Sequence, residues 1–456
     1  METMLNKIEI RYGKEQLITP GGLATVGLLI NKTNIYEESD KIKTTRRKPA
    51  INNSDIVGSY IGLLCQGKND YQAVNEFREE PEYYSGILGI KGIPSEETLR
   101  QRMDAIALSI QPVLKHSNTM LLNNAKVDPG LYMERYVPID IDTVPFDNSN
   151  SKKEGVSWTY KKFMGYTPIM AYMGTEGYGL GAELREGSQH SQKGTDIFLT
   201  QVLKSAKKIT NKPILVRMDS GFDSADNIEI CSKNETYAEF IIKRNMRKES
   251  KDEWYAHALH ENDFNENALT KYPRNGKTVY IGSTYRHLWP MDLEVRIVYE
   301  VIVRTSTASG QLLLDPDIEV HTYWASMDED GEGGLSDEQV IQAYHDHGTS
   351  EQYHSEIKSD MDLERFPSCN FKTNSAILLM GLFAYNILRI MGQISLRKDD
   401  APLKRPVSRR RIKTVIQNLI TIAVRVVRHA GKIYLSLGRS NAWRFAFKRI
   451  HEVLME

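Results

Sequence analysis

Apolar residues change their spacing along this chain, and that change limits what it can fold into. Over residues 53–121 they recur at intervals of three and four, which is the period of an α-helix. Over residues 136–243 they form short runs of strand length, separated by polar loops and by one helical stretch at 196–208. Strands joined by a crossover helix predict a mixed α/β core that follows a small helical domain.

The rest of the chain changes pattern again. Residues 252–327 are β-like in composition, and we expect strands joined by Gly, Asn and Asp turns at 279–281, 294–304 and 321–324. We interpret this stretch as a β-rich insertion inside the α/β domain. Beyond it, Ser336 is expected to cap a helix, and a long apolar helix is expected over 374–394.

Basic residues are concentrated near the carboxyl terminus. The whole chain carries 59 basic and 59 acidic residues, so its overall charge predicts no polyanion partner. Between residues 401 and 451, however, there are 13 Lys or Arg residues and no Asp or Glu, and the densest run holds Lys404, Arg405, Arg409, Arg410, Arg411 and Lys413. Such a cluster repels itself unless it is solvated or faces a polyanion, and the commonest polyanion is a phosphate backbone. The segment therefore indicates either a solvated basic face or a DNA-binding one.

Membrane and exported proteins are disfavoured by the apolar pattern. The longest apolar stretches, such as 376–384 and 419–427, fall well short of the roughly 20 residues that a membrane span needs. Residues 1–14 mix charged with apolar residues and offer no signal-peptide core. We expect a cytoplasmic protein with no membrane partner.

Two of the expected strands end in acidic residues. Asp140 and Asp142 are two positions apart on one strand, so they share a face, and their repulsion requires a cation or a proton nearby. Asp219 ends the strand at 213–218, next to Gly221, which allows a tight turn. Strand ends of this kind are the usual ligand position in an open α/β sheet, and their carboxylates suit Mg²⁺. Each acid taken alone also fits a turn or a helix cap.

A third group of polar residues has helical spacing. The group consists of Tyr344, His347, Glu351 and Lys358, separated by three, four and seven positions. These residues share one face if the helix is continuous, whereas a break at Gly348 would leave the first two on a preceding helix. Glu356 lies on the other side and is expected to face solvent. An acid and a lysine at this spacing fit a surface ion pair as well as a catalytic site.

The order and spacing of this group resemble the Tyr-Arg-Glu-Lys signature of bacterial insertion-sequence DDE transposases, with His347 where the signature has Arg. Within those enzymes the chain looks most like the thirteen-eighty insertion-sequence group. The similar segments are spread over most of the chain, at 93–100, 140–143, 165–169, 217–222 and 351–356. The departure at His347 concerns phosphate contact, because arginine grips an oxyanion bidentately at any pH and histidine does so only when protonated.

The resemblance implies a ribonuclease-H-like mixed sheet core with a β-rich insertion. Two Asp and one Glu of such a core would hold two divalent ions, Mg²⁺ or, as a substitute, Mn²⁺. These metal ligands would be Asp142, Asp219 and Glu351, with Asp219 77 positions after Asp142 and Glu351 132 positions after Asp219. Asp142 is preferred as the first catalytic acid, since Asp142 and Thr143 resemble the family's Asp-Ser-Thr, and Asp140 is the alternative.

The resemblance also implies DNA contacts. Tyr344, His347 and Lys358 would position phosphates, and the basic run with Arg409, Arg410 and Arg411 would bind element ends. Similar enzymes often hold an unstacked base on an aromatic ring; Trp289 and Trp324 are candidates, although each fits a core position equally well. Both ends of an element are cut together, which implies a homodimer in a synaptic complex with double-stranded terminal inverted repeats and target DNA.

We therefore expect a DNA transposase that hydrolyses phosphodiesters at element ends and transfers the 3′-OH into target DNA. The alternatives are a catalytically silent, transposase-derived DNA-binding protein and a hydrolase of another class with paired carboxylates. The expected divisions are a basic arm or linker at 1–50, a helical domain at 51–130 that binds DNA or is a structural bundle, the catalytic domain at 131–250 and 331–395, the insertion at 251–330, and a basic helical region at 396–456.

Overall fold

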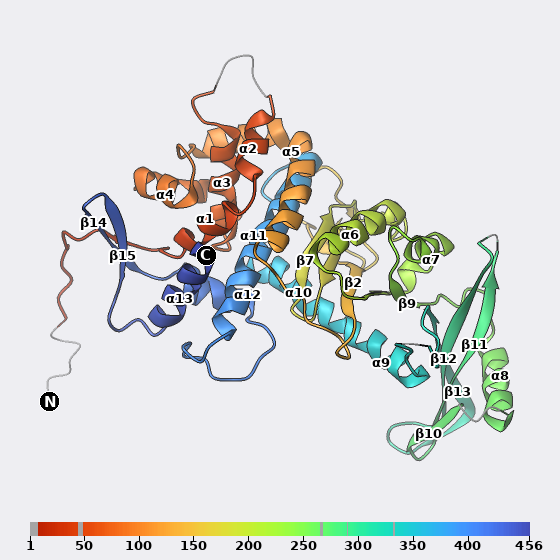
Figure 1. Cartoon of the computed structure of the whole chain (residues 1–456). Helices are drawn as coiled ribbons and strands as arrows, with labels where there is room; N and C mark the ends of the chain where they lie inside the picture. The colour runs from red at the N-terminus through yellow and green to blue at the C-terminus, as the bar shows by residue number, and fades with distance from the viewer. Residues whose placement is uncertain (1–7, 44–48, 265–267, 290, 332) are drawn as a thin grey trace.

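The computed structural model describes residues 8–43, 49–264, 268–289, 291–331 and 333–456. The most basic stretch of the expected amino-terminal arm, 44–48, lies outside the described residues. Figure 1 shows a helical part that contains the first and the last helices of the chain, a central α/β part and a group of long strands that projects from it.

A nine-stranded mixed sheet forms the α/β part. Its spatial order is β10-β11-β12-β13-β9-β8-β2-β6-β7. Strands β2 and β8 are parallel, as are β8 and β9, and the other neighbours are antiparallel. The strands are β2 (Val137–Thr143), β6 (Ile169–Met173), β7 (Tyr178–Glu183), β8 (Ile214–Met218), β9 (Glu239–Lys243), β10 (Leu269–Arg274), β11 (Lys277–Leu288), β12 (Leu293–Ser306) and β13 (Leu312–Ala325).

The expected insertion strands extend this sheet, because β13 pairs with β9. Helix α8 (Lys251–Phe264) packs on β11 and β13. A smaller sheet, with the order β3-β5-β4, lies between β2 and β6 in the chain and is built from β3 (Phe146–Asp147), β4 (Ser157–Trp158) and β5 (Met164–Tyr166).

The two faces of the large sheet are covered by different helices. One face packs on α6 (Thr195–Ile209) and α7 (Ala225–Ser232), where Val137, Ile139 and Ile141 of β2 are buried. The opposite face packs on α9 (Asp337–Asp346). Because side chains alternate along a strand, Asp140 and Asp142 lie on the face that α9 covers.

The helical part is built around two long helices that lie side by side in Figure 1, α5 (Glu96–Asn124) and α11 (Phe371–Leu396). The Ser95 side chain caps α5, as its sequence predicts. Among the described residues α11 alone is long and apolar enough to cross a membrane, and 94% of its most apolar stretch is buried within the protein. The remaining helices around this pair are α1 (Leu23–Ile30), α2 (Ile35–Lys41), α3 (Asn53–Leu64), η2 (Tyr71–Arg78), α4 (Pro81–Leu88) and α13 (Arg444–Met455).

The carboxyl-terminal region is only partly helical. After α12 (Ile412–Val415) and the π-turn η6 (Ile416–Ile420), the chain forms a hairpin of β14 (Val424–His429) and β15 (Lys432–Leu437). Strand β14 also pairs with β1 (Leu17–Ile18). The prediction of a helix is therefore wrong over the hairpin, because its alternating apolar and basic residues and the left-handed Gly431 suit two strands and a tight turn.

Candidate functional site

Asp140 is buried and fully engaged within the protein. Its side chain pairs with Arg217 of β8, with Arg217 Nε 2.6 Å from Oδ1 and Nη2 2.9 Å from Oδ2. Arg217 Nη1 also donates to the carbonyl oxygen of Ala343 in α9, at 3.0 Å. The Asp140–Arg217 pair therefore joins two strands to a helix, and only 4% of the Asp140 side chain is exposed.

Asp142, two residues further along β2, lies at the open end of the strand. Its Oδ1 accepts a hydrogen bond from the backbone N–H of Thr143 at 2.6 Å. Its Oδ2 lies 3.7 Å from Nε2 of His354, a buried side chain on α10 (Ser350–Ser355). The Nδ1 atom of that ring is 3.2 Å from the Tyr172 hydroxyl, so the ring is held between β6 and Asp142.

Asp219 follows directly after β8 and begins the short turn η3 (Ser220–Phe222). Its Oδ1 accepts the N–H of Gly221 at 2.9 Å, and a Cβ added at Gly221 would stand only 3.0 Å from that oxygen. Burial, followed by the negative charge of Asp142, raises the pKa of Asp219, although Gly221, His347 and Lys243 oppose the shift. Two carboxylates thus repel each other at the ends of neighbouring parallel strands.

Glu351 reaches the same region from a continuous but irregular helical run. The run follows α9 through the 3₁₀ turn η4 (His347–Thr349), then α10, and ends in the π-turn η5 (Glu356–Asp360). Gly348 lies within the 3₁₀ turn and does not end the run, because the flanking residues keep helical backbone angles. The change of pitch shifts the residues away from the single face that an ideal α-helix would give them.

The three acids lie within electrostatic reach of the Tyr160 hydroxyl. Burial, then the charges of Asp142, Asp219 and Glu351 in that order, raise the pKa of Tyr160 to about 12. Asp142, Glu351 and Tyr160 also line one open cavity of about 440 Å³. Acids 77 and 132 positions apart in the sequence are therefore brought within electrostatic reach of one hydroxyl group.

The donor chemistry of this place fits hard divalent cations. Carboxylate oxygens are what Mg²⁺ and Mn²⁺ prefer, and a cation would offset the repulsion that raises the pKa of Asp219. The buried Nε2 atoms of His347 and His354 beside these acids have no hydrogen-bond partner. Across the described ranges, no three His, Cys, Asp or Glu side chains already lie close enough together to enclose an ion.

Of the three residues expected to contact phosphates, only Lys358 lines the cavity. Its Nζ atom is held 3.0 Å from the carbonyl oxygen of Pro145 and 2.9 Å from Glu364 Oε1. His347 is 6% exposed, and its ring stacks on Tyr344 with centroids 6.0 Å apart. Lys358 therefore lies at the cavity wall, whereas Tyr344 and His347 do not line the cavity and lie within electrostatic reach of Asp219.

The three consecutive arginines of the basic segment contact other parts of the protein, although 56% of the Arg411 side chain stays exposed. Arg409 pairs with Glu356, Arg411 pairs with Asp360, and Arg410 is 6% exposed. Glu356 is itself buried, so the expectation that it faces solvent is wrong. Neither pairing could be read from the sequence, because the acids lie about 50 positions before the arginines.

The two candidate tryptophans differ in exposure. Trp324 is 6% exposed, and its indole N–H donates to Asp223 Oδ1 at 2.8 Å. Trp289, beside the β11–β12 turn, is 75% exposed, and its ring centroid lies 4.2 Å from that of His287. Only Trp289 of this pair offers a free ring face.

Tyr160 and His354 are residues of the site that the sequence did not single out. Tyr160 lies in a polar loop without a periodic pattern, so nothing marked it. His354 is three positions after Glu351, and the Glu-x-x-His spacing that places both residues on one helical side was a usable signal.

Comparisons with known proteins identify the family of this chain. The family model described as "Transposase DDE domain group 1" matches residues 3–456. No curated protein matches the chain. One similar solved structure is the piggyBac transposase synaptic complex with hairpin DNA, at 13% identity and a TM-score of 0.42, over 88% of this chain and 79% of that one. Because the family model spans nearly the whole chain, this protein belongs to the DDE transposase family, domain group 1.

Proposed function

We propose that this protein is an active DNA transposase of an insertion sequence, which cuts phosphodiesters at element ends and joins the 3′-OH to target DNA. The observation that carries the proposal is that Asp142 and Glu351 line one cavity, while Asp219, at the end of the neighbouring parallel strand, lies close enough to Asp142 for their charges to interact. Membership of the thirteen-eighty group, a bacterial source and a place in the cytoplasm, on the nucleoid when bound to DNA, are parts of the same proposal.

A ribonuclease-H-like core is supported by the strand order. Within the sheet, β7, β6, β2, β8 and β9 are consecutive, with an antiparallel meander on one side of β2 and two parallel partners on the other. In this arrangement two of the acids lie at adjacent strand ends, Asp142 on β2 and Asp219 after β8. The helical run that follows strands β10 to β13 in the chain then supplies Glu351.

Asp142, Asp219 and Glu351 would hold two Mg²⁺ or Mn²⁺ ions, which supply an activated water and stabilisation of the leaving 3′ oxygen. Lys358, fixed at the cavity wall, offers a positive charge to a phosphate that enters beside Asp142. Tyr160 stays protonated at neutral pH, since its pKa is about 12, and can donate its hydroxyl proton to a phosphate oxygen. Covalent attachment of DNA to the protein is not needed.

Double-stranded DNA, as terminal inverted repeats and as target, is the proposed substrate. Two ends must be cut together, so two copies of the chain are proposed to meet in a synaptic complex. Trp289 is the exposed aromatic available to an unstacked base.

A nicking assay with terminal inverted-repeat DNA and Mg²⁺ tests the proposal. Asp219→Ala is expected to abolish nicking and to leave DNA binding in a mobility-shift assay unchanged. The control is Asp226→Asn, which alters an exposed acid on α7 and should nick like the wild type. Equal nicking by Asp219→Ala and wild type would remove the assignment, and binding without any nicking by the wild type would favour a silent DNA-binding protein.

A further inference from the structure

We propose that the strap formed by residues 406–411 positions the helical run carrying Glu351, and that Arg409 is its main positioning residue. This inference rests on the proposed function. It assigns to the basic segment a role inside the catalytic centre, where its sequence alone favoured contact with DNA.

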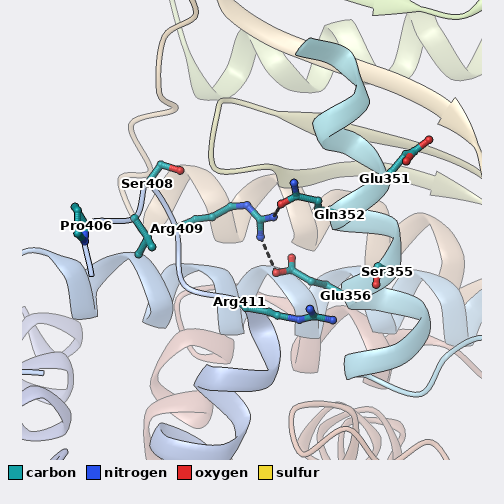
Figure 2. A pocket seen from close by; sticks show the side chains of 9 residues that line it. Glu351, Gln352, Ser355, Glu356, Pro406, Ser408, Arg409 and Arg411 are labelled. Atoms are coloured by element: carbon teal, nitrogen blue, oxygen red, sulfur yellow. Dashed lines mark hydrogen bonds and ion pairs between the residues drawn. The ribbon is translucent and has the colours of Figure 1, made fainter. Parts of the chain in front are cut away.

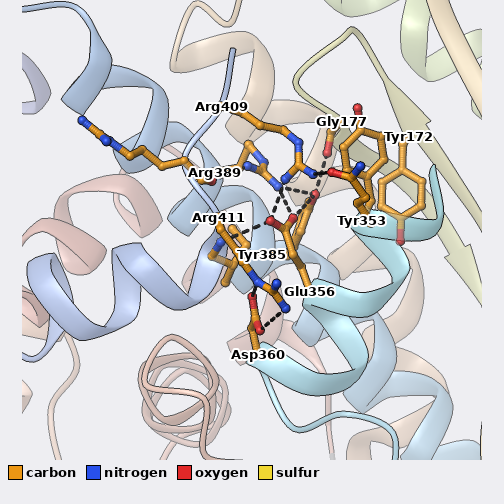
Figure 3. A network of polar contacts seen from close by, with 12 residues as sticks. Tyr172, Gly177, Tyr353, Glu356, Asp360, Tyr385, Arg389, Arg409 and Arg411 are labelled. Atoms are coloured by element: carbon orange, nitrogen blue, oxygen red, sulfur yellow. Dashed lines mark hydrogen bonds and ion pairs between the residues drawn. The ribbon is translucent and has the colours of Figure 1, made fainter. Parts of the chain in front are cut away.

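Glu356, five residues after Glu351, is the buried anchor of the strap. Arg409 Nη1 lies 2.6 Å from its Oε1 atom, and Arg389 of α11 pairs with its Oε2 atom. The backbone N–H of Ile412 also donates to Oε1 at 3.3 Å, and the Tyr385 hydroxyl lies 3.4 Å from Oε2 (Figure 3). Both oxygens of a 1% exposed carboxylate are therefore held by the core helix and by the strap.

Arg409 grips the helical run at a second point. Its Nη2 atom donates to Gln352 Oε1 at 2.7 Å, and its guanidinium lies 4.8 Å from the ring centroid of Tyr353. Figure 2 shows Arg409 reaching across to Gln352 and Glu356 while Glu351 projects away from the strap. Arg409 thus holds three residues that follow Glu351 in the helical run, Gln352, Tyr353 and Glu356.

Of the two following arginines, Arg411 holds the same helical run and Arg410 ties the strap to the helical core. Arg411 donates to both oxygens of Asp360, at 2.8 and 3.0 Å, at the end of the π-turn. Arg410 turns inward, with its guanidinium 5.5 Å from the Trp443 ring centroid, and its carbonyl oxygen accepts from Arg389 Nη1 at 2.7 Å. The strap is therefore tied to the core at each of three consecutive residues.

This anchoring matters because α10 is short. It has six residues, with a 3₁₀ turn before it and a π-turn after it, so its own backbone hydrogen bonds fix its direction poorly. The acids Glu356 and Asp360 also neutralise Arg409 and Arg411, which lowers the attraction of the strap for phosphate. A cavity of about 720 Å³ separates the rest of the strap from α10 and opens beside Glu351.

The test compares Arg409→Ala, Arg409→Lys and Gln352→Leu with Arg405→Ala, an exposed member of the same basic run. Three quantities are measured on the full chain: the dissociation constant for terminal-repeat DNA and its salt dependence, the single-turnover nicking rate, and Mn²⁺ binding by electron paramagnetic resonance. Arg409→Ala is expected to weaken Mn²⁺ binding and to slow nicking, each by about 10- to 100-fold, which is the size of effect seen for residues that orient metal ligands. The affinity for DNA should stay unchanged. Arg409→Lys should recover part of the loss, because lysine can still pair with Glu356.

Gln352→Leu removes only the outer contact of Arg409 and leaves the buried ion pair intact, so it keeps the test valid if Arg409→Ala does not fold. It should slow nicking less than Arg409→Ala does. Wild-type nicking and Mn²⁺ binding in folded Arg409→Lys and Gln352→Leu would overturn the proposal. The proposal would also be overturned if Arg409→Ala bound DNA more weakly, with a reduced salt dependence, while its Mn²⁺ binding stayed unchanged. That result would make Arg409 a DNA contact. If the wild-type protein does not nick DNA, the proposed function is refuted, and the positioning role of the strap is refuted with it.

Discussion

Arg217 holds Asp140 in a buried ion pair with two hydrogen bonds, at 2.6 and 2.9 Å, and both side chains are 4% exposed. Asp142, on the same face of the same strand, is not paired with an arginine in the structure and lies against His354. The two acids that looked equivalent in sequence therefore have different surroundings. One is placed to hold the sheet and α9 together, and the other is placed at the open end of the strand.

Substitution of the two acids should separate stability from activity. Asp140→Asn leaves the buried Arg217 cation without its carboxylate, which is expected to cost about 3–5 kcal/mol of unfolding free energy. Asp142→Asn should leave the unfolding free energy within about 0.5 kcal/mol and abolish nicking. Chemical denaturation measures the unfolding free energy of both variants, and the nicking assay measures their activity. Loss of nicking with full stability in Asp140→Asn would instead make Asp140 the catalytic acid.

Glu249 should stabilise the protein in a pH-dependent way. Burial alone would raise its pKa, but hydrogen bonds from Arg244, Arg286 and Trp254 outweigh burial and lower the pKa to about 2 from an ordinary 4.5. Since the folded pKa is the lower one, this stabilisation is complete above pH 4.5 and is lost as pH falls toward 2. Glu249→Gln should cost about 1–3 kcal/mol at pH 7.

The difference between wild type and Glu249→Gln should shrink steadily between pH 4.5 and pH 2 in denaturant unfolding. Glu253→Gln, an exposed acid on α8, is the matched control and should show no such trend. A stability difference that stays constant over this range would contradict the assigned role of Glu249.

Substitution of Trp324 should lower the stability of the protein, whereas substitution of Trp289 should lower its affinity for DNA. Trp324→Phe removes the hydrogen bond to Asp223 and is expected to cost about 1–3 kcal/mol of stability. Trp289→Ala should leave stability within about 0.5 kcal/mol and weaken affinity for DNA with an unpaired terminal base by about 1–3 kcal/mol. Melting curves measure the stability of both variants, and the fluorescence of a 2-aminopurine placed at the unpaired base measures its stacking on residue 289. Unchanged base fluorescence in Trp289→Ala would refute the stacking role.

Removal of divalent ions should stop the reaction without unfolding the protein. EDTA is expected to abolish nicking, and added Mg²⁺ or Mn²⁺ should restore it, while the melting temperature changes by no more than a few degrees. The reason is that the three acids lie on elements fixed by buried apolar clusters, with no ion required to hold them there. Nicking that continues in EDTA would exclude metal-dependent chemistry.

Much of the fold was predictable from local pattern. Strand β9 was expected where it lies, β8 within one residue, and Ser336 caps α9 through the backbone N–H of Gln339. These elements follow from apolar period and capping, which are properties of neighbouring residues. The hairpin at 424–437 lies where a basic helical region was predicted, because a basic composition does not distinguish a helix from a strand.

The site could be predicted only in part, because its pairings join distant residues. Acids at strand ends mark Asp142 and Asp219, yet alternation alone cannot distinguish Asp142 from Asp140, since only contact with Arg217 separates them. In the same way, composition marks Arg409 as basic but cannot reveal that Glu356 lies beneath it. The expected domain boundaries and DNA contacts stay predictions.

The most direct test of the central claim is metal-centred cleavage of the polypeptide. Fe²⁺ is bound in place of Mg²⁺ with terminal-repeat DNA present, ascorbate and peroxide generate hydroxyl radicals at the ion, and the fragments are mapped by mass spectrometry. We expect cuts close to residues 142, 219 and 351, which are suppressed by excess Mg²⁺ and absent in Asp219→Ala. Cuts confined to one of these positions, or located elsewhere in the chain, would contradict a shared metal centre.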